Sequence, residues 1–281
     1  MLVEIALGDA YGAGFEYARP AIVARENTLA AFRAHPKQRI AAGTYTDDTQ
    51  MCIAIAEAIL SHRPFSRELI AECMVQAFKR DPREGYARGF YEVLLEVNDG
   101  SEFLARISPD SDKSGAAMRA GPIGLFPRLQ DVIERTTLQA RLTHDTPDGV
   151  NAAVAAALAV HFCAYELGAV SELGEFLTEY VPGQWSTPWQ GKVGSKGWMS
   201  VRAAITALSR ATSMSELLKD CIAFTGDVDT VAAIAMAAGS CCPGLEQDLP
   251  DHLYSTLENG EWGRDTLREL DRQLMEKVLR R

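Results

Sequence analysis

The chain has 281 residues, of which 47% are hydrophobic and 23% are charged. A chain of this length and composition can bury a large apolar core without disulfides or structural zinc. Its formal net charge is −10. Because an acidic surface repels a phosphate backbone, generic nucleic-acid binding is excluded, and a phosphate-bearing ligand must be held by a local positive group.

Several features indicate a cytoplasmic protein without a membrane segment. Residues 1–4 lack the basic region and cleavable apolar stretch of a signal peptide. The most apolar run, residues 152–160, is followed by His161 and Glu166 and is shorter than the roughly 20 residues of a membrane span. The six cysteines include no Cys-x-x-Cys pair, which is typical of buried thiols in a reducing compartment. The sequence carries no signal for an oligomeric state.

Apolar residues recur at helical spacing along most of the chain, and strand-like alternation is nearly absent. Three glycines near the N-terminus are expected to break a short first helix and to leave Glu16 on a flexible turn. Further helices are predicted over residues 51–59, 69–78, 150–167, 231–238 and 267–281. The helix over 150–167 is apolar on most sides, so we expect it at the centre of the fold.

Two polar stretches, residues 98–115 and 180–197, are predicted to be long loops. Loops longer than about 15 residues are usually functional or disordered. No linker divides the chain, and no internal repeat is visible. We therefore predict one all-α domain spanning residues 1–281.

A first acidic motif, Thr46-Asp47-Asp48, lies at the start of the helix predicted over 51–59. Thr46 is a reasonable N-cap, and an acidic residue in a first turn is favoured by the helix dipole. Two adjacent carboxylates nevertheless repel each other unless a cation or a proton lies between them. The motif alone therefore fits either a helix cap or a site for a hard cation such as Mg²⁺.

A second motif, Asp227-Val228-Asp229-Thr230, precedes the Ala-rich helix predicted over 231–238. This motif also fits either a cap or a metal site, because acidic groups at the buried end of a core helix must be paired, protonated or metal-bound. Together the two motifs offer about six hard oxygen ligands with no His or Cys nearby, which favours one or two Mg²⁺ ions over zinc.

Three further segments contain candidate functional groups. Glu16 follows Gly8-Asp9 and two more glycines, and is interpreted either as a surface residue after a helix end or as a carboxylate near the metals. The turn that begins at Ser114-Gly115 offers backbone N–H groups to a phosphate, although a glycine turn alone is weak evidence. His144 fits either a capping histidine or a ligand-binding one.

In this order, these elements resemble the ADP-ribosylglycohydrolase family, which includes the dinitrogenase-reductase-activating glycohydrolase and the ADP-ribosyl-arginine and ADP-ribosyl-serine hydrolases. The similarity covers most of the chain, and the two acidic motifs together are more specific than either alone. It is carried by these stretches: Gly8-Asp9-x-x-Gly12-x-x-x-Glu16, Thr46-Asp47-Asp48-Thr49-x-Met51, Ser114-Gly115-Ala116-Ala117-Met118-Arg119, Thr143-His144 and Gly226-Asp227-x-Asp229-Thr230.

The resemblance implies a compact orthogonal helical bundle with a central cleft for two Mg²⁺ ions, with Mn²⁺ as the other candidate metal. It implies that the metal ligands are Thr46, Asp47, Asp48, Asp227, Asp229 and Thr230. It implies that Asp47, Asp48 or Glu16 is the general acid or base, and these three alternatives stay open. The implied substrate-binding residues are Glu16, Ser114, Gly115, Met118, His144, Gly197 and Trp198, with the Trp198 ring stacked on adenine.

The sequence departs from the family pattern at two places. Lys113-Ser114-Gly115 stands where Gly-Asn-Gly is common, and Thr225 and Val228 replace residues of the usual Gly-Gly-Asp-Thr-Asp-Thr. The ligand positions survive both changes, so the metal site is expected to be retained and the phosphate-binding details to differ.

The implied activity is hydrolysis of the bond between ADP-ribose and a modified protein side chain or a small acceptor. Two alternatives remain open at this point. One is a non-catalytic ADP-ribose-binding or crystallin-like protein, and the other is a two-metal phosphoester hydrolase. The products distinguish the two enzymes, since glycohydrolysis leaves ADP-ribose intact.

Overall fold

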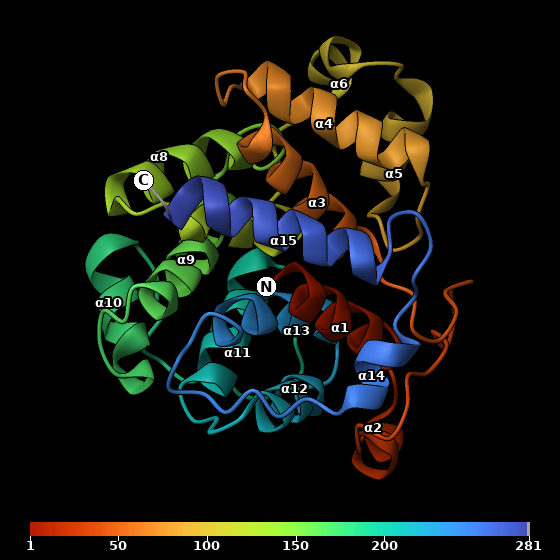
Figure 1. The fold of residues 1–281 in the computed structure, drawn as a ribbon, viewed down its shortest axis with the longest axis vertical. Helices are drawn as coiled ribbons and strands as arrows, with labels where there is room; N and C mark the ends of the chain where they lie inside the picture. Colours follow the sequence, from red (N-terminus) through yellow and green to blue (C-terminus); the bar gives the residue numbers. More distant parts are fainter. Residues whose placement is uncertain (280–281) are drawn as a thin grey trace.

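The computed structural model describes residues 1–279 of the chain, and the regular secondary structure in that range is helical (Figure 1). Strand-type pairing among these residues is limited to four isolated bridges. The prediction of an all-α fold is confirmed. The predicted final helix over 267–281 is observed as far as residue 279, and its last two residues lie outside the described range.

The helices follow one another with short connections in most places. Their bounds are α1 (Leu2–Ala13), α2 (Pro20–Glu26), α3 (Asp47–Leu60), α4 (Arg67–Arg80), α5 (Arg88–Glu96), α6 (Gly100–Arg106), α7 (Gly115–Met118), η1 (Gly121–Leu125), α8 (Leu129–Ala140), α9 (Pro147–Ala164), η2 (Val170–Glu172), α10 (Leu173–Tyr180), α11 (Gly197–Leu208), α12 (Met214–Ala223), α13 (Val228–Gly239), α14 (Asp251–Thr256) and α15 (Arg264–Leu279).

Helices α9 and α13 form the centre of the core. Every residue of α13 is buried, and the helix packs against α1, α9, α11 and α12. By length and composition α9 is apolar enough to cross a membrane, but 72% of its apolar window is buried inside the protein. The apolar surface of α9 is therefore already covered by the chain itself, as expected for a central helix.

The predicted break in the first helix is wrong, because α1 runs without interruption through Gly8 and Gly12. These glycines instead allow α1 and α13 to approach closely. A Cβ atom on Gly12 would lie 2.4 Å from the Cα of Asp229, and one on Gly8 would lie 2.9 Å from the carbonyl oxygen of Ala232. Small residues at i and i+4 share one face of a helix, so this face of α1 touches the acidic start of α13.

A buried carboxylate joins α1 to α3. Asp9 is fully buried and accepts hydrogen bonds from the backbone N–H groups of Thr46 and Thr49, at 2.9 and 3.0 Å, and from both hydroxyls, at 2.8 and 2.6 Å. Thr46 stands at the N-cap position as predicted, but its side chain does not cap the helix. Asp9 caps α3 from a neighbouring helix instead, because the Thr46 hydroxyl donates to it.

The remaining helices enclose this centre. In Figure 1, α15 lies across α1 and α3, and both of these contacts are close. The polar stretch 98–115 is not a continuous loop as predicted, since α6 occupies residues 100–106. Asp99 caps α6 by accepting hydrogen bonds from the N–H groups of Ser101 and Glu102, a local signal that the sequence interpretation missed. The stretch between α10 and α11, residues 181–196, is irregular as predicted.

Replacing Asp9 with Ala is expected to lower the free energy of unfolding by about 3 kcal/mol, because two buried N–H groups at the start of α3 lose their acceptor. Urea denaturation at pH 7 measures the change. The matched control is Asp99→Ala, which removes an exposed cap and is expected to cost about 1 kcal/mol. Equal losses of unfolding free energy in the two variants would show that the buried cap stabilises the protein no more than the exposed cap does.

Candidate active site

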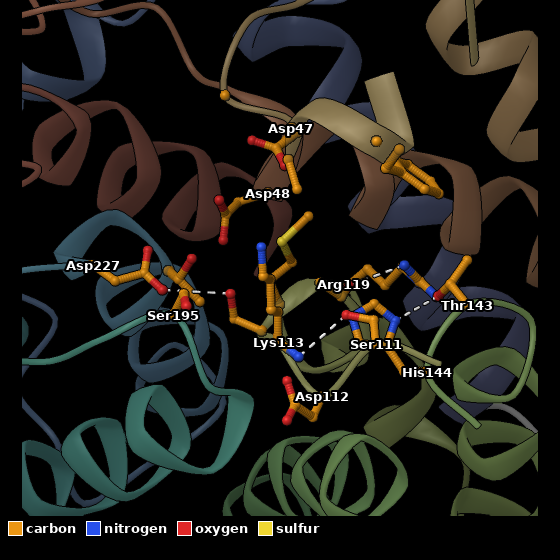
Figure 2. Close-up of a pocket in the computed structure, with 18 of the residues that line it drawn as sticks. Asp47, Asp48, Ser111, Asp112, Lys113, Arg119, Thr143, His144, Ser195 and Asp227 are labelled. Carbon is orange, nitrogen blue, oxygen red and sulfur yellow. Dashed lines mark hydrogen bonds between the residues drawn. The ribbon is translucent and has the colours of Figure 1, made fainter. Parts of the chain in front are cut away.

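A cavity of about 660 Å³ lies where α3 and α13 begin. This volume suits a ligand of nucleotide size. Figure 2 shows Asp47, Asp48 and Asp227 on one side of the cavity and Arg119, Thr143 and His144 on the other. We refer to these as the carboxylate side and the histidine side.

The carboxylate side consists of two pairs of aspartates from the first turns of two helices. Asp47 and Asp48 begin α3, while Asp227 and Asp229 flank the first residue of α13, and none of the four is more than 8% exposed. Both helix N-termini therefore direct the positive ends of their dipoles toward this side. The two acidic motifs, about 180 residues apart in the sequence, are brought together as predicted.

Burial raises the pKa of all four carboxyl groups, and their mutual repulsion adds to it. The pKa values of Asp47, Asp48 and Asp229 lie well above their ordinary value, because of burial first and then neighbouring carboxylates. The pKa of Asp227 is raised to about 6 by burial and by Glu16. Such a cluster is stable only when protons or cations neutralise part of its charge.

The residues of this side fit a hard divalent cation. Three carboxylate oxygens, one from each of Glu16, Asp227 and Asp229, all lie within 4.8 Å of one another. Within the described residues, Asp48 Oδ1 and Asp229 Oδ1 are buried and have no hydrogen-bond partner. A buried carboxylate oxygen of this kind is stable only when a proton or a cation reaches it. Because every candidate ligand is an oxygen atom, the set matches the preference of Mg²⁺, Mn²⁺ or Ca²⁺ rather than zinc.

The two predicted threonine ligands lie beside these carboxylates. Thr230 is 3% exposed in the first turn of α13 and lines the cavity with Asp48 and Asp227. Thr46 is almost fully buried and is not among the residues that line the cavity, and its hydroxyl donates to Asp9.

Glu16 reaches the carboxylate side from the turn after α1. The backbone N–H of Tyr17 donates to the carbonyl oxygen of Gly226 at 2.9 Å, which joins this turn to the second acidic motif. Glu16 also forms a 2.7 Å hydrogen bond with Nε2 of His35. Although the sequence predicts a flexible turn, the structure shows it bonded through both its backbone and its acidic side chain.

The histidine side offers polar donors. Four of the predicted substrate-binding residues, Ser114, Gly115, Met118 and His144, line the cavity. Burial, followed by the nearby charge of Arg119, lowers the pKa of His144 to about 3, so this imidazole is neutral at physiological pH.

Arg119 favours one tautomer of that imidazole. The guanidinium is 1% exposed and donates to Gln139, to the carbonyl oxygen of Gly115 and to the Thr143 hydroxyl. The Thr143 hydroxyl, which accepts from Arg119, lies 2.6 Å from Nδ1 of His144 and can donate its own proton there. In that arrangement the proton of the neutral His144 ring is on Nε2. Arg119 orders this wall and is not free to bind a ligand.

The structure does not place Gly197 and Trp198 in this cavity. Trp198 lines a second cavity of about 370 Å³. Its ring packs edge-on against the ring of Trp189, with 5.7 Å between the two ring centroids. Gly197 is buried, and its N–H donates to the carbonyl oxygen of Asp112 at 3.0 Å. The predicted adenine-stacking residue Trp198 thus lines a different cavity from the carboxylates.

Several cavity residues were missed by the sequence interpretation. Gly85 has φ +106°, and a Cβ atom there would lie 2.1 Å from Asp47 Oδ1, so only glycine fits. Phe90 and Tyr17 supply the aromatic surface, and Lys113 and Ser195 line the cavity as well. Of these, only Gly85 carried a local signal, since it follows Pro82 in a short turn-like stretch.

The fold and site define an all-helical protein with a carboxylate-lined site suited to a divalent cation. The model of the ADP-ribosylglycohydrolase family matches residues 1–281, so the chain belongs to that family. A solved structure titled "ADP-ribosylglycohydrolase-related protein complex" has a TM-score of 0.72 and 20% sequence identity, covering 99% of this chain and 96% of that one. At that identity the likeness establishes the fold alone.

Curated relatives carry hydrolase names. ADP-ribosylhydrolase ARH3 of Xenopus tropicalis is 35% identical over 128 residues, which is 42% of this chain and 36% of the relative. The Mus musculus ARH3 is 27% identical over 274 residues, covering 77% of this chain and 74% of that protein. ADP-ribosylarginine hydrolase Tri1 of Pseudomonas putida is 23% identical, covering 83% of this chain and 67% of Tri1.

Without a divalent cation, the protein is expected to lose stability as the pH rises from 5 to 8. Each raised pKa means that the folded state binds more protons than the unfolded state between the ordinary and the raised value, so stability falls across that window. For Asp227 the window runs from 3.8 to about 6, and this residue alone contributes up to about 3 kcal/mol. The other three aspartates extend the window upward.

Urea denaturation at pH 5 and pH 8 in the presence of a chelator measures this pH dependence of stability. Asp227→Asn is expected to flatten it, because the amide does not titrate. Added Mg²⁺ is expected to reverse it, since cation binding requires deprotonated ligands. Chelator-treated protein that becomes more stable as the pH rises would contradict the proposed charge repulsion.

Proposed function

We propose that this protein is a magnesium-dependent hydrolase that cleaves the glycosidic bond between ADP-ribose and an acceptor and releases ADP-ribose. The observation that carries the proposal is the carboxylate side, where two buried acceptor oxygens lack any partner among residues 1–279. Family membership and a cavity of nucleotide size support the choice of ligand.

The carboxylate side has the groups that glycosidic hydrolysis requires. Bound Mg²⁺, with two ions as the proposed number, would supply the positive charge that orients ribose hydroxyls and a water molecule. Asp47, Asp48 and Glu16 are the carboxylates that can accept a proton from that water. Carboxylate oxygens also stabilise the positive charge that develops on the sugar ring as the bond to the acceptor breaks.

The histidine side suits the diphosphate. With its proton on Nε2, the neutral His144 ring donates a hydrogen bond at all pH values well above 3. Gly115 lies beside this ring, and the neighbouring Ser114 hydroxyl donates to Asp227 Oδ2 at 3.4 Å. A cavity with hydrogen-bond donors on one side and a cation site on the other can bind an anionic ligand in one orientation.

Lys113 adds a positive charge that the family pattern lacks at this position. Figure 2 shows it between the carboxylate and histidine sides. Among residues 1–279 its ammonium group has no hydrogen bond or ion pair, whereas the cavity residues Arg106 and Arg119 are engaged with Glu96 and Gln139. Lys113 is thus available to a phosphate group of the substrate.

The acceptor is proposed to be a modified protein side chain or a small molecule. The name of Tri1 specifies arginine as the acceptor of that relative, and arginine is therefore the first acceptor to test. All six cysteines are free thiols, which supports the proposed cytoplasmic location.

The main test incubates ADP-ribosyl-arginine, ADP-ribosyl-serine and other ADP-ribosylated acceptors with the protein, with and without Mg²⁺, and detects free ADP-ribose by mass. Asp229→Asn is expected to lower kcat/KM by at least about 100-fold, because a lost ligand removes several kcal/mol of transition-state stabilisation. The control is Asp220→Asn on α12, which lies outside the cavity. Release of AMP and ribose phosphate would instead identify a phosphoester hydrolase.

Lys113→Gly is expected to raise KM about 5-fold with little change in kcat, because a charge-assisted hydrogen bond to a phosphate oxygen is lost. The wild-type KM should rise with salt more steeply than that of the variant. Lys196→Ala is the matched control, since Lys196 is paired with Asp112 at the rim. An unchanged KM in Lys113→Gly would exclude a direct contact with the substrate.

A further inference from the structure

His35 lies in the long segment between α2 and α3, where regular secondary structure is absent over residues 27–46. The histidine is only 8% exposed although it belongs to a polar stretch rich in exposed residues. No sequence motif singles it out. Its burial therefore needs a local explanation.

The ring of His35 is held by its own loop. Its Nδ1 accepts hydrogen bonds from the backbone N–H groups of Lys37 at 3.0 Å and Gln38 at 2.8 Å. The backbone N–H of His35 donates to the carbonyl oxygen of Ile40 at 3.0 Å. A nitrogen that accepts two hydrogen bonds carries no proton, so the proton of the neutral ring is on Nε2.

That proton is directed at Glu16. Nε2 of His35 lies 2.7 Å from Oε2 of Glu16, and the carboxylate is 15% exposed. The ring cannot turn over without losing both bonds to Nδ1, so the direction of the donor is fixed. The contact therefore restricts Glu16 more than a bond to a freely rotating side chain would.

Adjacent contacts hold this loop against the end of α1. A Cβ atom on Gly14 would lie 2.7 Å from the carbonyl oxygen of Arg33, so the two segments touch at backbone level. The guanidinium of Arg33 lies 5.1 Å from the ring of Phe15. The loop that presents His35 is thus packed on the residues that immediately precede Glu16.

We propose that His35 is a positioning residue that holds the Glu16 carboxylate against Asp227 and Asp229 and thereby sets the cation affinity of the site. Oxygen atoms of these three carboxylates already lie within 4.8 Å of one another. Hydrogen bonds to ligating carboxylates fix their orientation and raise metal affinity. The inference rests on the proposed cation site but not on the proposed reaction.

Two substitutions at position 35 separate the contact with Glu16 from the folding of the loop. His35→Asn keeps an acceptor near the place of Nδ1, which can bond the N–H group two residues on as Asn does in turns, but it is too short to reach Glu16. His35→Gln keeps a donor near the place of Nε2. The loop is therefore retained in the first variant and the bond to Glu16 in the second.

Calorimetric titration with Mn²⁺ gives the affinity without turnover. His35→Asn is expected to weaken Mn²⁺ binding about 10-fold, the lower end of the range for lost partners of metal ligands. His35→Gln is expected to remain within about 3-fold of the wild type, because it still donates to Glu16. His252→Ala is the matched control, since His252 bonds the carbonyl oxygen of Leu29 in the same segment, and it should leave the affinity unchanged.

A double-mutant cycle tests whether His35 acts through Glu16. In a Glu16→Ala background, His35→Asn should change the Mn²⁺ affinity less than about twofold, because the group it positions is absent. A 10-fold loss that persists in that background would overturn the proposal, as would wild-type affinity in His35→Asn. Thermal unfolding of the metal-free variants verifies that each one is folded.

The outcomes for His35 and for the reaction are distinguishable. If no acceptor in the panel is hydrolysed while the Mn²⁺ affinities follow the expected cycle, the proposed reaction fails and the role of His35 stands. If ADP-ribose is released normally and His35→Asn binds Mn²⁺ like the wild type, only the role of His35 is wrong. Absence of Mn²⁺ binding by the wild-type protein would overturn the role of His35 directly.

Discussion

The carboxylate of Asp9 accepts four hydrogen bonds from Thr46 and Thr49, and the next turn of the same helix packs Gly12 against Asp229. Through these two contacts α1 touches the first turns of both helices that carry the acidic motifs. The turn after α1 then adds Glu16. The relative positions of these five carboxylates therefore depend on Gly8, Asp9 and Gly12 of α1 and on the turn that follows the helix.

This arrangement is electrostatically unfavourable by itself. Burial and mutual repulsion raise the pKa of all four aspartates on the carboxylate side. The apolar core that α9 and α13 build against their neighbours provides the free energy that keeps the charges together. A site of this kind is pre-organised, because the ligands do not need to be assembled when the cation arrives.

The sequence predicted the all-helical fold and the meeting of the two acidic motifs, because helical periodicity and clustered acidic residues are local patterns. It did not predict that Gly8 and Gly12 lie within a continuous helix, because the packing partner of a glycine is not encoded in its neighbours. The caps on α3 and the bond from His35 to Glu16 were missed for the same reason. The resemblance assigned Trp198 to adenine stacking, and its place in a second cavity depends on tertiary packing that the sequence does not show.

The cavity draws its two kinds of residues from different parts of the fold. The carboxylates lie in helix first turns, whereas Gly85, Lys113 and Ser195 lie in irregular segments around the opening. In evolutionary terms the two sets can change at different rates, since a substitution at Lys113 or Ser195 lies outside the α1–α3–α13 packing, whereas Gly85 is fixed by its contact with Asp47. A new acceptor preference can therefore arise, by natural drift or by directed evolution, without rebuilding the charged centre.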